Sequence, residues 1–223
     1  ASGHVGWQAR AACGRAVIAD LAGDDATVLA ELDAAPPGAL DPGWDAVAQW
    51  LAGNTLVGLG DADGAQARAD AVGPVDDPNL ALTMGGLRFM IDWLRGDVDS
   101  VAATIGGFIE HIRASGMVHN LAIAVPTAAR VMAYLGDLEA ARSYLARAAE
   151  VADRDAVGEA AATAALQVGE ADEDGAAATL RAALALSPIG AGASRRAWRQ
   201  ALALTYVLVP ETREEWDATG LRG

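Results

Sequence analysis

The fold is decided by one stretch of the chain, Leu135-Gly136-Asp137-Leu138-Glu139-Ala140-Ala141-Arg142-Ser143-Tyr144-Leu145-Ala146-Arg147-Ala148. We expect Gly136-Asp137 to end one helix and to begin the next. Glycine accepts a left-handed backbone conformation, and aspartate accepts hydrogen bonds from the free N–H groups of a first helical turn. Beyond the turn, Ala141, Leu145 and Ala148 recur at helical spacing. Two of these three side chains are small, so the stretch predicts a tight hairpin of closely packed helices.

The same unit recurs along the sequence. Turns are expected at Gly23, Gly60, Gly96, Gly136 and Ala171, at intervals of 37, 36, 40 and 35 residues. Five, nine and twelve residues after each turn the sequence places apolar side chains, which are Val28, Leu32, Ala35, Ala65, Ala69, Val72, Val101, Ile105, Phe108, Ala141, Leu145, Ala148, Ala176, Leu180 and Ala183. A helix–turn–helix unit with a period in the mid-thirties is typical of a solenoid.

We therefore predict an all-α fold, a right-handed α-solenoid of about six antiparallel helix pairs, as a single domain over residues 1–223. About a quarter of the residues are alanine, the strongest helix former, and aromatic residues are few. The turns predict helices over residues 4–21, 26–34, 44–59, 63–72, 77–95, 98–114, 117–135, 138–152, 155–168, 172–186, 194–209 and 211–218. In the seventh, Pro126 is expected either to kink the helix or to mark its true start.

Charge and composition exclude several functions. The net charge of −14 and the pI near 4.4 argue against direct nucleic-acid binding and against an anionic membrane surface. All 16 cationic residues are arginine, so a phosphate-binding or Schiff-base lysine is excluded. Neither the three histidines nor the single cysteine, Cys13, has the spacing of a metal site. We expect no cofactor, no metal and a buried structural thiol.

No apolar run is long enough to cross a bilayer, and no signal peptide precedes the first helix. The expected location is therefore cytoplasmic. Because the chain begins at Ala1 rather than at methionine, we interpret it as a fragment or a processed form.

At these positions the chain resembles the tetratricopeptide repeat family. The resemblance is carried by the Gly-Asp turns and by a set of matching positions, namely Gly53, Ala65, Ala141, Leu145, Ala176, Leu180 and Pro188. The alanine-rich, lysine-free sequence also resembles the helical sensor region of large actinobacterial transcription regulators of the LuxR, antibiotic-regulator (SARP) and STAND types.

In the tetratricopeptide family the first helix of each pair lines a concave groove. The resemblance therefore implies groove positions at Arg10, Trp50, Asn54, Met90, Trp93, Arg130 and Tyr134. Tryptophan, tyrosine and arginine are the residues that most often anchor partners. The groove would take a protein, a peptide or a small-molecule effector, with the arginines recognising a carboxylate. Trp50 and Trp93 can equally be core residues between repeats.

These patterns favour a non-catalytic binding scaffold, by resemblance the effector-sensing or interaction region of a bacterial transcription regulator. Its partners would include other domains of the same parent chain. Two other readings stay open at this point. One is a free-standing adaptor or co-chaperone that binds peptides. The other is a helical enzyme, which would need an acidic metal cluster inside its helices, whereas the acidic residues here lie mainly at the expected turns.

Overall fold

The computed structural model describes residues 2–36, 38–73, 76–151 and 155–186, and these residues form ten α-helices and no β-strand. The all-α prediction is therefore confirmed for this part of the chain. The helices predicted over 194–209 and 211–218, and Pro188, lie outside the described residues. No helix in the described ranges is long and apolar enough to span a bilayer.

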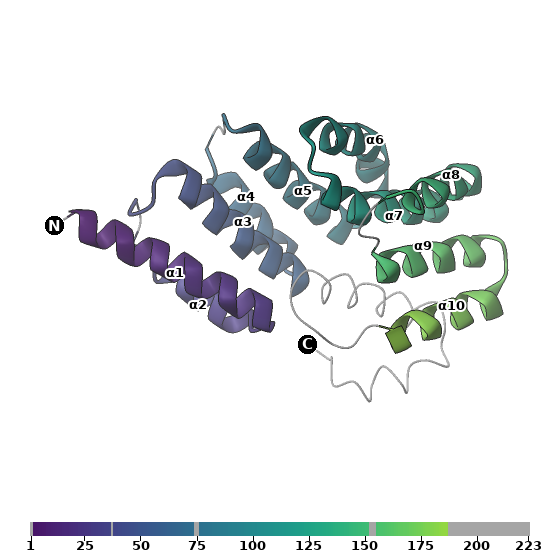
Figure 1. The fold of residues 1–223 in the computed structure, drawn as a ribbon, viewed down its shortest axis with the longest axis horizontal. Coiled ribbons are helices and arrows are strands. Elements are labelled where there is room, and N and C mark those ends of the chain that lie inside the picture. The colour runs from purple at the N-terminus through teal and green to yellow at the C-terminus, as the bar shows by residue number, and fades with distance from the viewer. Residues whose placement is uncertain (1, 37, 74–75, 152–154, 187–223) are drawn as a thin grey trace. The chain divides into compact units, whose positions relative to one another are not determined.

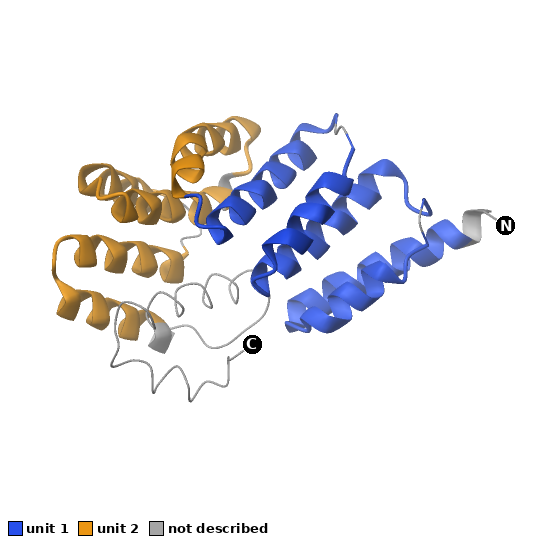
Figure 2. Ribbon diagram, turned by 180° about the vertical axis from the view of Figure 1, so that it is seen from behind, with its two compact units in different colours: residues 1–97 blue, residues 98–223 orange. Residues whose placement is uncertain are grey.

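The chain divides into two compact units, Ala1–Asp97 and Val98–Gly223 (Figure 2). Unit 1 contains α1 (Ser2–Ala22), α2 (Asp25–Asp33), α3 (Pro42–Gly58), α4 (Ala62–Ala71) and α5 (Pro78–Leu94) (Figure 1). Unit 2 contains α6 (Val98–Ser115), α7 (Val118–Tyr134), α8 (Leu138–Ala148), α9 (Ala156–Gly169) and α10 (Glu173–Leu186). A single domain over residues 1–223 stays a prediction.

The five aligned turns share one backbone structure. Gly23, Gly60, Gly96, Gly136 and Ala171 all have a left-handed conformation, with φ between 61° and 83°. At the turn after α7, the Gly136 N–H donates to the Ala133 carbonyl over 3.1 Å, and the Asp137 N–H donates to the Met132 carbonyl over 2.9 Å. The same two hydrogen bonds recur at the other four turns. Together they satisfy carbonyl groups that the end of each helix leaves free.

The aspartate after the turn residue also begins the next helix. Asp24, Asp61, Asp137 and Asp172 each accept a hydrogen bond from a backbone N–H three residues later, over 2.8–3.0 Å. Asp41 and Asp77 cap α3 and α5 in the same way, each followed by a proline in the first helical turn. The helix predicted from residue 77 thus begins within one residue of its expected start, and the helix predicted from residue 44 begins two residues earlier, at Pro42.

The apolar positions counted from the turns face the interior. The first position of each set is fully buried, with an exposed fraction of 0% at Val28, Ala65, Val101, Ala141 and Ala176. None of the fifteen positions is exposed. Seven of the fifteen side chains are alanine, and such small side chains let helices pack closely against one another.

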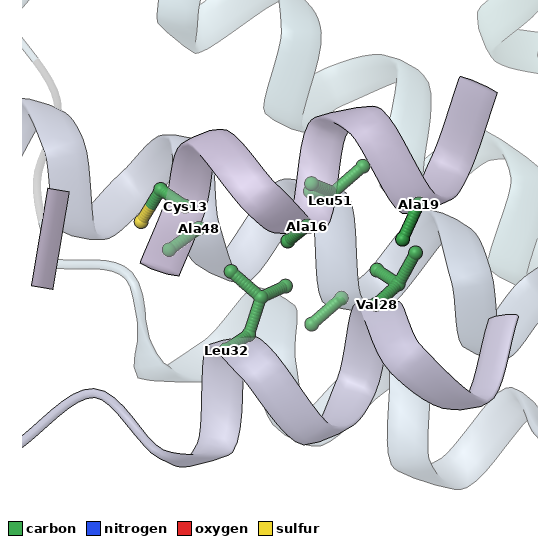
Figure 3. Close-up of a cluster of buried hydrophobic side chains, with 8 residues drawn as sticks. Cys13, Ala16, Ala19, Val28, Leu32, Ala48 and Leu51 are labelled. Atoms are coloured by element: carbon green, nitrogen blue, oxygen red, sulfur yellow. The ribbon is translucent and has the colours of Figure 1, made fainter. Parts of the chain in front are cut away.

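Within each unit, helices contact their neighbours in a regular order. In unit 1, α3 contacts α4 and α5, and it also contacts α1 and α2. In unit 2, α7 contacts α6, α8 and α9, and α9 contacts α8 and α10. Figure 3 shows one resulting core, in which Cys13, Ala16 and Ala19 of α1 meet Val28 and Leu32 of α2 and Ala48 and Leu51 of α3. Cys13 is buried there, and burial raises the pKa of its thiol. The prediction of a buried thiol is confirmed.

The structure corrects one local expectation and decides between the two alternatives left open at Pro126. The helix expected over 138–152 ends at Ala148, because the N–H groups of Glu150 and Val151 bond to carbonyls only three residues back and tighten the chain into a turn. Pro126 lies inside α7 and is not its start.

We predict opposite stability changes at two equivalent turn positions. Ala171 adopts φ 61°, a conformation that costs a residue with a Cβ about 1 kcal/mol relative to glycine. Ala171→Gly is therefore expected to raise the free energy of unfolding by about 1 kcal/mol, and Gly136→Ala to lower it by about as much. Urea unfolding followed by circular dichroism measures both changes. Equal signs for the two variants would contradict this account of the turn.

Candidate functional site

Four of the seven predicted site residues lie on α3 and α5, two helices of unit 1 that contact each other. Trp50 and Asn54 are one turn apart on α3, Met90 and Trp93 are one turn apart on α5, and all four are half-buried. Trp50 and Met90 pack on the same core, which is formed by Val57, Ala65, Ala69, Met84, Leu87 and Ile91. We call Trp50, Asn54, Met90 and Trp93 the α3–α5 surface.

A close approach of the two helices brings these residues together. A Cβ added to Gly53 on α3 would lie 2.6 Å from Leu87 Cδ2 on α5, so only glycine fits beside Leu87 without a shift of that buried side chain. Gly53 stands between Trp50 and Asn54 in the sequence. The backbone of α3 therefore lies close to Leu87 of α5 at a point between Trp50 and Asn54.

Trp50 serves the core as well as the surface. Its side chain packs both on the core of α1, α2 and α3 and on the core of α3, α4 and α5. The sequence left open whether Trp50 is a groove residue or a core residue. In the structure its side chain packs on two cores, yet the residue remains only half-buried. Large aromatic side chains that combine a fixed packed part with an accessible part are typical of binding anchors.

Arg10 lies elsewhere, on α1, and its guanidinium reaches the N-terminal cap of α3. Its guanidinium forms an ion pair with Asp41 over 2.6 Å and lies 5.6 Å from the ring centroid of Trp7 and 5.9 Å from that of Trp44. Both tryptophans are exposed. Sequence reasoning did not single out Trp7, Asp41 and Trp44 as neighbours of Arg10. The contact between Arg10 and Trp7 could have been predicted, because residues three apart on one helix lie on the same face.

Arg130 and Tyr134 lie one turn apart on α7 in unit 2. Arg130 is only 7% exposed, and burial lowers the pKa of its guanidinium, while nearby Tyr134 and Asp155 raise it. Burial also raises the pKa of Tyr134 to about 12, against the opposing effect of the Arg130 charge, although 38% of the residue is exposed. Of the two arginines predicted to bind a partner's carboxylate, Arg10 is thus ion-paired with Asp41, and Arg130 is under the electrostatic influence of Asp155. Their role in binding stays a prediction.

The described residues contain no group of three or more histidine, cysteine, aspartate or glutamate side chains placed to hold a metal ion. Comparison with protein-family models, with curated proteins and with solved structures finds no match for this chain. The similarity to tetratricopeptide repeats therefore remains a resemblance of sequence pattern.

We predict an acid-dependent loss of stability that depends on Asp41. The pKa of Asp41 lies below its usual value of 3.8, chiefly because the Trp44 N–H donates a hydrogen bond to its carboxylate and also because Arg10 is nearby. A carboxyl group with a lowered pKa in the folded state stabilises the fold above its unfolded value, and this contribution is lost as pH falls through the folded value. Wild type should therefore exceed Asp41→Asn in stability at neutral pH, and the difference should shrink below pH 3.8.

Urea midpoints of the two proteins across this pH range measure the difference. Asparagine is a comparable helix cap, so the variant chiefly removes the charge. A difference that stays constant down to the acid limit would contradict the assigned role of Asp41.

We further predict that Arg130 is needed for the stability of unit 2. Arg130→Ala removes a buried charged side chain beside Tyr134 and Asp155, so the free energy of unfolding should fall by about 2–4 kcal/mol. Arg113→Ala is the matched control, because Arg113 lies in the same unit and its side chain is 51% exposed. The control should leave the urea midpoint nearly unchanged. Equal midpoints for the two variants would show that burial of Arg130 contributes nothing.

Proposed function

We propose that the chain is a non-catalytic binding scaffold, a right-handed α-solenoid of tetratricopeptide-like helix pairs. The observation that carries this proposal is the α3–α5 surface. There, two neighbouring helices present two tryptophans, a methionine and an asparagine, all half-buried. These residue types suit the binding of an extended or helical peptide, with apolar anchors and one amide for orientation.

The regular construction of each unit supports the scaffold. Every aligned turn has the same pair of hydrogen bonds, and the odd-numbered helices α1, α3 and α5 contact one another in sequence within unit 1. The contact between α7 and α9 repeats this relation in unit 2. Such stacking through nearest neighbours is how solenoids are stabilised.

The electrostatics of the site favour an uncharged or weakly charged contact. Arg10 is paired with Asp41, and Arg130 lies within the influence of Asp155. A partner's carboxylate would have to compete with Asp41 for Arg10 and with Asp155 for Arg130. A partner's apolar side chains could pack on the α3–α5 surface without displacing a carboxylate of the chain. The partner is accordingly a peptide or helix whose apolar side chains fill the spaces around Trp50 and Trp93.

The setting we propose is a bacterial transcription regulator in which this region senses an effector or contacts other domains of the parent chain. The alanine-rich, lysine-free composition supports this setting by its resemblance to such sensor regions. A cytoplasmic location belongs to the same proposal. Occupation of the surface would act through a shift in superhelix curvature or through docking of a neighbouring domain.

Selection from a phage-displayed random peptide library tests the binding function. Wild-type protein should select related apolar peptides, and Trp93→Ala should weaken their binding about tenfold or more. Trp44→Ala is the matched control, since Trp44 is an exposed tryptophan of unit 1 outside the α3–α5 surface. The control should bind the selected peptides as wild type does.

Circular dichroism of Trp93→Ala shows whether the variant is folded before its affinity is interpreted. Unchanged affinity in the folded variant, or an equal loss in Trp44→Ala, would overturn the assignment of the surface. Failure to select any peptide would overturn peptide binding. The sequence on both sides of the region in the parent gene tests the regulator setting, which requires an ATP-binding loop or a DNA-binding helix-turn-helix segment.

A further inference from the structure

The chain contains two aspartate–glycine pairs, and both lie in the first turn of a helix. Asp63-Gly64 begins α4, and Asp174-Gly175 begins α10. An aspartate followed by glycine is especially prone to form a succinimide, because glycine has no side chain to shield its backbone nitrogen. This reaction needs no enzyme and no reagent other than water. Each pair is therefore a place where the chain could modify itself.

The reaction at such a pair rearranges the backbone without changing its composition. The glycine nitrogen gives up its proton and bonds to Cγ of the aspartate, and the carboxyl group loses its hydroxyl as water leaves. Water then adds to one of the two carbonyl groups of the ring and breaks the bond from that carbonyl to nitrogen. When the main-chain bond breaks, the chain continues through the side chain and the residue has become isoaspartate. The extra backbone atom does not fit the hydrogen-bonding pattern of an α-helix.

The fold restrains both glycine nitrogens in the same way. The Gly64 N–H donates to Asp61 Oδ1 over 2.8 Å. The Gly175 N–H donates to Asp172 Oδ1 over 3.0 Å. A Cβ added to either glycine would collide with the cap carboxylate, so this carboxylate lies directly against the glycine. A nitrogen held in this way cannot turn toward the neighbouring aspartate, and its attack requires the first helical turn to open.

The two reacting aspartates differ in what holds their carboxylates. Asp63 Oδ1 accepts a hydrogen bond from Arg95 Nη2 over 2.9 Å, which ties the start of α4 to the end of α5. Asp174 is exposed and forms no ion pair with any residue that the structure describes. Since the described residues restrain the first turn of α10 less than that of α4, we expect the α10 turn to open more often.

Helix α9 has an unreactive version of the same helix start. Its cap, Asp155, accepts the Gly158 N–H over 3.0 Å and also lies where a Cβ of that glycine would be. The residue before Gly158 is Val157, so the glycine nitrogen has no neighbouring carboxyl group to attack. The cap geometry is therefore independent of the aspartate that makes the other two starts reactive.

We propose that Asp174 is a site of isoaspartate formation in the folded chain and that its rate is set by the cap at Asp172. Opening of the first turn of α10 releases the Gly175 N–H, and the Asp174 carboxyl group then reacts with this nitrogen. The inference is separate from the proposed function, because it concerns the backbone chemistry of α10 and not the α3–α5 surface.

The modification changes the packing of α10 on α9. Ala176, Ala177 and Leu180 follow the reacting pair and are buried in a core with Ala164 of α9. An extra backbone atom just before these residues shifts their register against α9. Isoaspartate at residue 174 therefore loosens this part of unit 2.

Tryptic digestion of the full chain allows the two sites to be measured separately. Asp63 falls in the peptide of residues 16–68, and Asp174 falls in the peptide of residues 155–181. Electron-transfer fragmentation in a mass spectrometer distinguishes isoaspartate from aspartate at each position after prolonged incubation at neutral pH. In the folded wild type, Asp174 should convert about twofold faster than Asp63, the factor expected from one exposed ion pair. In urea, where neither turn exists, the two rates should become nearly equal.

Two cap variants test the mechanism, and each is the matched control of the other. Asp172→Ala should raise the rate at Asp174 about fivefold, which corresponds to the loss of one helix cap, and leave Asp63 unchanged. Asp61→Ala should raise the rate at Asp63 by a similar factor and leave Asp174 unchanged. Asp172→Asn keeps a capping side chain and should convert as wild type does. Asp174→Glu keeps the charge and should abolish the modification, because the larger ring closes far more slowly.

Each outcome decides the inference. Absence of isoaspartate at Asp174 in the folded chain, or equal folded rates at the two sites, overturns the proposal. A rate at Asp174 that does not respond to Asp172→Ala overturns control by the cap, as does conversion of Asp172→Asn at a raised rate. Circular dichroism shows that each variant is folded, and an unchanged rate at the site in the other unit shows that the effect is local.

Discussion

The structure depends on a two-residue junction that closes one helix and opens the next. The backbone N–H of the aspartate satisfies a carbonyl of the preceding helix, while its side chain accepts an N–H of the following one, as at Asp24, Asp61, Asp137 and Asp172. A single aspartate thus satisfies a free carbonyl at the end of one helix and a free N–H at the start of the next. Because the left-handed turn residue reverses the chain within so short a link, the two helices must lie side by side.

Packing follows from the position of this junction. Once the turn fixes where the second helix begins, the residue five positions beyond the turn necessarily faces the preceding helix. That position is fully buried in all five aligned repeats, and it holds alanine in three of them and valine in two. A small side chain there permits close approach, and in four of the five repeats a larger residue four positions later fills the remaining volume. The ion pairs between helices are mostly exposed and add little to this arrangement.

The candidate surfaces differ in how they combine burial and access. Trp50 is fixed by two cores and remains partly accessible, whereas Arg130 is almost wholly enclosed beside Tyr134 and Asp155. Trp7 and Ile18 are more than two-thirds exposed on a helix whose other side is packed. Rigid, half-buried aromatic residues are suited to holding a peptide.

The sequence by itself determined the helices, their turns and the inward positions, because these depend on local backbone chemistry and on a period fixed by the helix. Even Ala171 was placed correctly at a turn without glycine. The C-terminal end of α8 escaped it, since that end depends on hydrogen bonds to carbonyls three residues back that compete with the helical ones. At Pro126 the sequence left two alternatives open, and the structure places the proline inside α7. Only the tertiary structure decided that Arg10 lies between two tryptophans and beside Asp41, that Arg130 is buried, and that Trp50 joins two cores. These features arise from contacts between helices, and helical periodicity specifies a face without specifying what that face meets.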